Sequence, residues 1–91
     1  MTTVAAYYKI DSEHVAQSLN EAREKLVSED GEAVLDFAAV LRIDTSGLQA
    51  IEDLASAAEQ KSVKVTLRGV NVNVYKVLKL SRLTSRFSFV N

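Results

Sequence analysis

The sequence predicts an α/β domain in which helices pack on a mixed, mostly parallel sheet. Short segments with alternating apolar and polar residues are separated by longer segments that carry apolar residues every three to four positions. One short run, Ala33 to Phe37, is mostly apolar on both faces, which is typical of a strand in the centre of a sheet. Beyond it, a polar run from Asp44 to Gly47 stands where the apolar pattern changes to that of a helix. Functional groups commonly collect at such a junction.

Length and composition describe a single domain, residues 1–91, with one modest core. Hydrophobic residues make up 47% of the chain and charged residues 25%, which is ordinary for a globular protein. The formal net charge of −1 argues against a nucleic-acid binder, because no basic stripe is available to neutralise phosphates. The absence of Cys excludes disulfides and thiolate metal sites, and a lone His argues against zinc. No cofactor is expected.

The chain also lacks the sequence features of a membrane or secreted protein. No apolar run reaches the ~20 residues that span a bilayer, and the amino terminus lacks the order of a signal peptide. We therefore expect a cytoplasmic protein with no direct membrane insertion. With one His and no Cys, the chain has few side chains from which a catalytic centre could be built. We therefore predict that it is not an enzyme but a module that contacts a protein partner. Whether it forms a homodimer is left open.

The first half of the chain is expected to supply a strand, a helix and the central strand. Apolar and polar residues alternate from Thr2 to Ile10, as in a strand. A helix is expected to follow this strand and to end at Gly31, which can adopt the left-handed backbone conformation. His14, near the start of this helix, is predicted to be a surface residue. Asp36 is expected to accept backbone N–H bonds from the loop that follows its strand. The apolar face of the helix consists of Val15, Leu19, Ala22 and Leu26.

The second half is expected to add a helix from Thr45 to about Gln60, a strand from Val63 to Leu67 and a final helix. Asn71 or Asn73 is the expected cap of that final helix. The last residues, Phe87 to Val90, form either a short strand or a packed tail. The core-facing residues of the final helix are Val74, Val77, Leu78 and, as a further candidate, Leu80. A basic cluster of Lys76, Lys79, Arg82 and Arg86 is attributed to solubility and to the helix dipole.

The polar run Asp44-Thr45-Ser46-Gly47 has a structural interpretation as a helix cap. All three polar residues are good caps, and Ser46 with Gln49 fits a capping box. A cap needs only one such group, however, and a glycine in the first turn costs up to about 1 kcal/mol relative to alanine. We therefore expect the run to form a site, with Gly47 kept free of a side chain for the approach of a partner or of a neighbouring loop.

Four segments of the chain together resemble the STAS family (sulfate transporter and anti-sigma factor antagonist). They are Leu35-Asp36-Phe37, Ile43-Asp44-Thr45-Ser46-Gly47-Leu48, Val65-Thr66-Leu67 and Val77-Leu78-Lys79-Leu80-Ser81-Arg82-Leu83. The family pattern is a strand and an Asp followed by two Ser/Thr residues, Gly and Leu. Two features depart from it. The amino-terminal part has room for one strand where many relatives have a hairpin, and Arg82 stands where a Gly is usual.

The resemblance implies a small STAS-like domain that acts as an anti-sigma factor antagonist in transcription regulation. Such relatives bind an anti-sigma factor with a serine kinase fold, which phosphorylates the hydroxyl after the Asp. That hydroxyl belongs to Thr45 here, with Ser46 as its neighbour. The expected partner-binding residues are Asp44, Thr45, Ser46, Gly47, Leu48, Gln49 and Glu52.

An alternative with the same fold stays open. The chain also resembles the small STAS subunit that binds the ATPase of phospholipid-trafficking ABC transporters, in which Thr45 would be an interface residue. The short amino terminus favours this version. An enzyme with Asp36 and Asp44 as paired carboxylates is disfavoured, because no metal ligands and no nucleophile–base pair accompany these two residues in the sequence. An aspartic protease is disfavoured too, because Ser46 interrupts the Asp-Thr-Gly triplet and the predicted fold contains helices.

Overall fold

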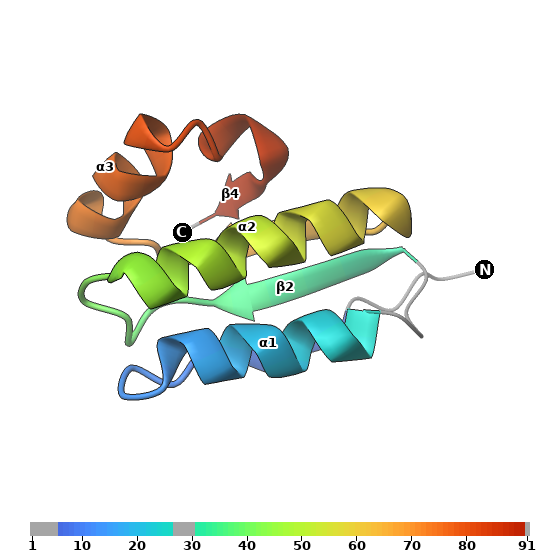
Figure 1. Cartoon of the computed structure of the whole chain (residues 1–91), viewed down its shortest axis with the longest axis horizontal. Coiled ribbons are helices and arrows are strands. Elements are labelled where there is room, and N and C mark those ends of the chain that lie inside the picture. Colours follow the sequence, from blue (N-terminus) through green and yellow to red (C-terminus); the bar gives the residue numbers. More distant parts are fainter. Residues whose placement is uncertain (1–5, 27–30, 91) are drawn as a thin grey trace.

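The computed structural model describes residues 6–26 and 31–90. Strands and helices alternate along the chain, as the sequence predicts (Figure 1). The last segment, which the sequence left open between a strand and a packed tail, is a strand. The expected strand residues 2–5 and the expected helix end at residues 28–30 lie outside the described residues. The elements are β1 Ala6–Lys9, α1 Val15–Leu26, β2 Glu32–Asp36, α2 Thr45–Gln60, β3 Lys64–Arg68, α3 Val72–Leu80, a 3-10 turn η1 Thr84–Arg86 and β4 Ser88–Val90.

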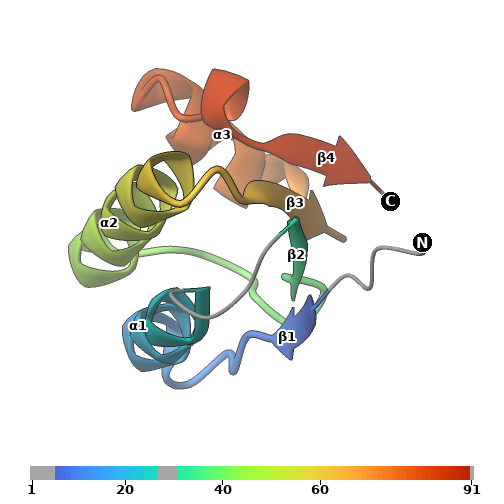
Figure 2. The same ribbon diagram turned by 90° about the vertical axis from the view of Figure 1, so that its right-hand side faces the viewer.

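The four strands form one sheet in the order β1-β2-β3-β4, and every neighbouring pair is parallel. The prediction of a mostly parallel sheet is therefore confirmed, and the described sheet is parallel throughout. Helices α1 and α2 lie side by side on one face of this sheet, and α3 lies near β3 and β4 (Figure 2). Because each helix connects parallel strands, all three helices begin at the edge where the strands end (Figure 1).

One hydrophobic core lies between the sheet and the helices. The predicted helical stripe is confirmed, since Leu19, Ala22 and Leu26 are buried and Val15 packs against the core. The inward-facing residues of β2 and β3 are buried as well, namely Ala33, Leu35, Val65 and Leu67, and so are Phe37 and Val63 next to these strands. Leu80 was a candidate core residue, but it is 86% exposed. It lies two positions beyond the buried Leu78, which turns it about 200° around the helix axis.

In the segment after α3, the structure settles the turn at Arg82, which the sequence left open, and corrects the expected place of Arg86. Arg82 has a φ of 60°, so it adopts the left-handed conformation that the usual glycine would adopt without strain. Arg86 does not join Lys76 and Lys79 in a basic cluster. Its Nε and one terminal nitrogen donate to the Glu59 carboxylate of α2, over 2.7 and 2.9 Å. This hydrogen-bonded pair lowers the pKa of Glu59 and raises that of Arg86.

Candidate functional site

The loop between β2 and α2 carries the predicted motif and is fixed at several points. The buried Phe37 donates its N–H to the Arg68 carbonyl over 2.8 Å, and the Val40 N–H returns to the Phe37 carbonyl over 2.9 Å. Farther along, the Asn71 side-chain amide donates to the carbonyls of Val40, over 3.2 Å, and Leu41, over 2.9 Å. The loop is thus held by β3 on one side and by the start of α3 on the other.

Asp44 is the cap of α2. Its extended backbone places the carboxylate over the first turn, where Oδ1 accepts the Gly47 N–H over 2.8 Å. Ser46 and Gln49 do not form the capping box that their spacing allows, because Ser46 lies inside the first turn of α2. Gln49 donates instead to the Asp53 carboxylate, one turn farther along the helix, over 3.1 Å.

The side chains expected to meet a partner divide into an exposed and a supporting set. Asp44, Thr45, Ser46 and Gln49 are exposed, and Glu52 is half-buried. Leu48 is also half-buried and packs against the core. Thr45 and Ser46 are therefore exposed at the start of the helix that follows the inner strand β2.

Gly47 is the buried member of the motif. A Cβ atom at this position would lie 2.7 Å from Cγ1 of Ile43 and 3.3 Å from Cγ1 of Val15 on α1. The missing side chain therefore lets α2 pack closely against its own loop and against α1. The sequence suggested that either a partner or a neighbouring loop approaches this glycine closely. In the structure, it is the chain's own residues Ile43 and Val15 that do so.

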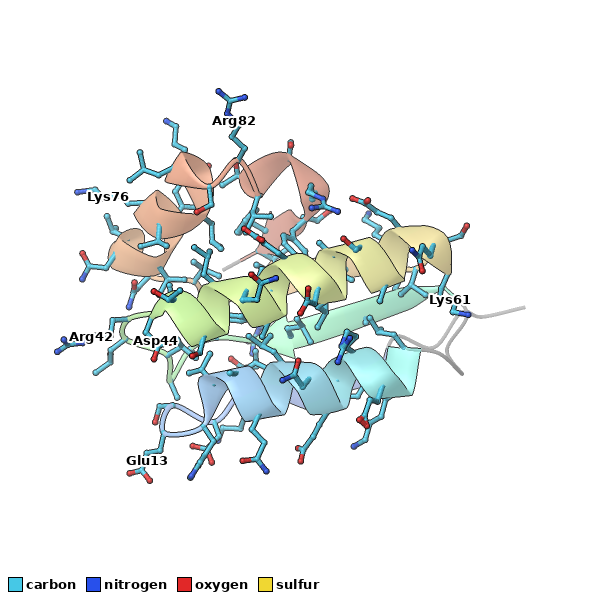
Figure 3. All side chains as sticks on the ribbon, viewed as in Figure 1. Glu13, Arg42, Asp44, Lys61, Lys76 and Arg82 are labelled. Carbon is cyan, nitrogen blue, oxygen red and sulfur yellow. The ribbon has the colours of Figure 1, made fainter. Side chains whose placement is uncertain are left out.

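A shallow groove runs between the starts of α1 and α2, with a volume of ≈ 410 Å³. One wall comes from the α1 end and includes Ser12, Glu13, His14 and Gln17. Arg42, Asp44 and Ser46 form the other wall, and Figure 3 shows Arg42, Asp44 and Glu13 at this end of the molecule. Sequence reasoning missed the α1 wall, since its residues lie about thirty positions from the motif. The apolar stripe of α1 was the available signal, because it predicts the packing that brings the two helix starts together.

Asp36 has the structural role that the sequence predicts. Its Oδ1 accepts the Ala38 N–H over 2.9 Å, and its Oδ2 accepts the hydroxyl of Tyr7 on β1. These bonds, the Tyr7 bond foremost, lower the pKa of Asp36, and the same contact raises the pKa of Tyr7. Arg68 approaches the Tyr7 oxygen at 3.5 Å. Asp36 thus belongs to a network on the sheet, whereas Asp44 caps a helix.

The described part of the chain contains neither a metal-binding cluster nor a membrane-spanning helix. Within residues 6–26 and 31–90, no group of His, Cys, Asp or Glu side chains has the arrangement of a metal site. None of the helices in that part of the chain is long and apolar enough to cross a membrane.

The chain is similar in sequence to a known protein of two bacteria. The protein MlaB of Escherichia coli K12, described as an intermembrane phospholipid transport system binding protein, is 37% identical over 81 residues. The match covers 89% of this chain and 80% of MlaB, and MlaB of Shigella flexneri gives the same values.

Two solved structures share the fold. A sulfate transporter family protein from Wolinella succinogenes has a TM-score of 0.78 at 19% identity, covering 98% of this chain and 80% of its own. A putative anti-sigma factor antagonist from Thermotoga maritima has a TM-score of 0.67 at 18% identity, covering 96% and 73%. The family model of the STAS domain matches residues 9–91, so this chain belongs to the STAS domain family.

Proposed function

We propose that this protein is the STAS-domain binding subunit of a phospholipid transport system, and that it binds the ATPase of that system in the cytoplasm. The observation that carries the proposal is the 37% identity to MlaB over 89% of the chain. The sequence raised this function as the alternative to an anti-sigma factor antagonist. In the proposed function, the chain acts as a binding protein and carries out no catalytic step.

The first turn of α2 is the proposed docking surface. Thr45, Ser46 and Gln49 present two hydroxyls and an amide on a helix whose start is capped by Asp44. Gly47 and Leu48 support this turn from within, and Glu52 continues the surface along the helix. Because the helical backbone that carries these groups is already formed and capped, docking requires little further loss of backbone freedom.

A phosphorylation switch at the same turn is a second candidate function. The exposure of Thr45 and Ser46 at a helix start favours it, because a kinase can reach them and the helix dipole tolerates a phosphate there. A phosphate adds roughly −1.5 to −2 charges beside Asp44 and so changes the surface offered to a partner. Under this candidate the partner is an anti-sigma factor kinase, and Thr45 is its substrate.

The test measures the affinity of the purified protein for the ATPase subunit of its own organism's phospholipid transport system. We expect Thr45→Glu to weaken binding about tenfold or more, because the added carboxylate is desolvated beside Asp44. The thermal midpoint should barely change, since an acidic group in a helix's first turn contributes only about 0.3–1 kcal/mol. Gln60→Glu, at the other end of the same helix, is the matched charge control and should bind like the wild type.

Absence of binding by the wild-type protein would contradict the transport proposal. Phosphorylation of Thr45 by an anti-sigma factor kinase of the same organism, together with that absence, would establish the second candidate in its place. A sharp fall in the thermal midpoint of Thr45→Glu with unchanged affinity would make Thr45 a folding residue.

A further inference from the structure

Large apolar side chains are exposed together around the start of α3. Of the six exposed large hydrophobic residues among those described, Leu41, Val72, Tyr75 and Val90 belong to this region. Leu41 is 73% exposed and Val72 is 68% exposed. A shallow groove of ≈ 250 Å³ continues from Val72 to Tyr75 and Val90. An exposed apolar area of this kind usually marks an interaction site. We call these four residues the α3 patch.

The patch is held rigidly by Asn71. The side-chain oxygen of Asn71 accepts the Val74 N–H over 2.8 Å and so caps α3. Its amide nitrogen donates to the carbonyl of Leu41, over 2.9 Å, which ties the loop before α2 to the same point. In the lining of the groove, the Tyr75 and Phe89 rings meet edge to face with centroids 5.3 Å apart. A partner would therefore meet preformed apolar groups.

Free positive charge borders the patch. Residues 61–91 contain seven Lys and Arg and no Asp or Glu, whereas residues 1–60 contain four basic and twelve acidic residues. Among the described residues, Arg42 and Lys76 form no ion pair, unlike Arg86 with Glu59 and Lys64 with Glu32. Figure 3 shows Arg42 and Lys76 pointing outward at the same end of the molecule. Unpaired cations around an apolar centre fit a partner surface that carries carboxylates.

We infer that the α3 patch is a second part of the docking surface and receives an apolar segment of the partner flanked by carboxylates. The inference rests on the proposed function, because the partner is the same ATPase. The patch lies at the sheet edge where α2 also begins, and the loop of Leu41 leads directly into Asp44. One partner can therefore cover the first turn of α2 and the α3 patch together.

The apolar contribution is tested by the affinity of Leu41→Ser and Val72→Ser for the ATPase. We expect each variant to bind about tenfold more weakly, as when an aliphatic contact is lost from an interface. Leu80→Ser is the matched control, because Leu80 is 86% exposed on the same helix but lies about 12 Å along it from Val72. Its affinity should stay within about twofold of the wild type. Circular dichroism and the thermal midpoint should show every variant folded, since the replaced side chains are exposed.

The charge contribution is tested by Arg42→Glu and Lys76→Glu. We expect each to weaken binding and to reduce its dependence on salt concentration, because attraction to carboxylates becomes repulsion. Lys61→Glu is the matched control, since Lys61 is exposed at the opposite end of the molecule (Figure 3).

The outcomes separate this inference from the proposed function. If Thr45→Glu abolishes binding while the patch variants bind like the wild type, the α3 patch is not part of the interface and the proposed function stands. If the wild type does not bind the ATPase, both the proposed function and the inference about the α3 patch are refuted. If Val72→Ser turns a dimer into a monomer in light scattering and leaves the affinity for the ATPase unchanged, the patch serves a second copy of this chain and the inference is overturned.

Discussion

Gly47→Ala provides a direct test of how α2 is packed. On an isolated helix, alanine would be the better residue by about 1 kcal/mol. In this fold the new methyl carbon would lie 2.7 Å from Cγ1 of Ile43 and 3.3 Å from Cγ1 of Val15. Both neighbours are β-branched and stiff at χ1, so neither moves away easily.

The structure sets the sign and the size of the expected effect. Overpacking of this kind costs about 1–3 kcal/mol, which exceeds the gain in helix propensity. We expect a net loss of about 1 kcal/mol, which lowers the thermal midpoint of a domain of this size by about 4–8 °C. Thermal and urea denaturation, followed by circular dichroism, would measure both quantities.

A double-mutant cycle with Ile43→Ala identifies the cause. Ile43→Ala removes the crowding carbon, so adding Gly47→Ala to that background should stabilise the domain by up to about 1 kcal/mol. This reversal of sign is the expected signature of the steric contact. A Gly47→Ala variant that is more stable than the wild type would refute the packing argument.

Three further predictions concern the cap of α2, the turn after α3 and the loss of stability at low pH. Asp44→Ala should cost about 0.5–2 kcal/mol of unfolding free energy in urea denaturation, while Asp44→Asn, which keeps an acceptor for the Gly47 N–H, should cost little. Arg82→Gly should raise the thermal midpoint, because left-handed backbone costs a non-glycine residue about 1–2 kcal/mol and glycine's extra entropy offsets about half of that. The lowered pKa of Asp36 contributes stability that is present above the ordinary pKa of an aspartate and disappears as the pH falls through the folded-state pKa. Tyr7→Phe removes the main cause of that shift, so NMR titration should find the Asp36 pKa closer to its ordinary value, and an unchanged pKa would exclude the Tyr7 bond as the cause.

The order of strands and helices could be predicted from the sequence because burial imposes a period on it. Alternation marks Val63 to Leu67, and a helical stripe marks Val15 to Leu26, wherever each segment happens to pack. The STAS motif was also readable, since Asp44 to Leu48 are contiguous and their order is specific. The exposure of Thr45 and Ser46 followed from their place at the start of a helix.

The choice of cap was not predictable from local sequence. Asp44, Thr45 and Ser46 all offer a suitable oxygen, so composition alone cannot select among them. The helix begins at Thr45 in the fold, which makes Asp44 the residue with extended backbone and a carboxylate over the first turn. Gly47 fits closely between Ile43 and Val15, and that packing fixes where the turn lies.

Residues that meet from distant parts of the chain were decided by tertiary structure alone. Arg86 pairs with Glu59 across 27 positions, and Asn71 binds the Leu41 carbonyl across 30. The sequence by itself determined the α/β alternation, the motif and its place at the start of a helix, because each depends on neighbouring residues or on a short period. The α1 wall of the groove, the role of Gly47 and the α3 patch depend on how the helices are set on the sheet. Those positions result from the packing of the whole core, and no single segment encodes them.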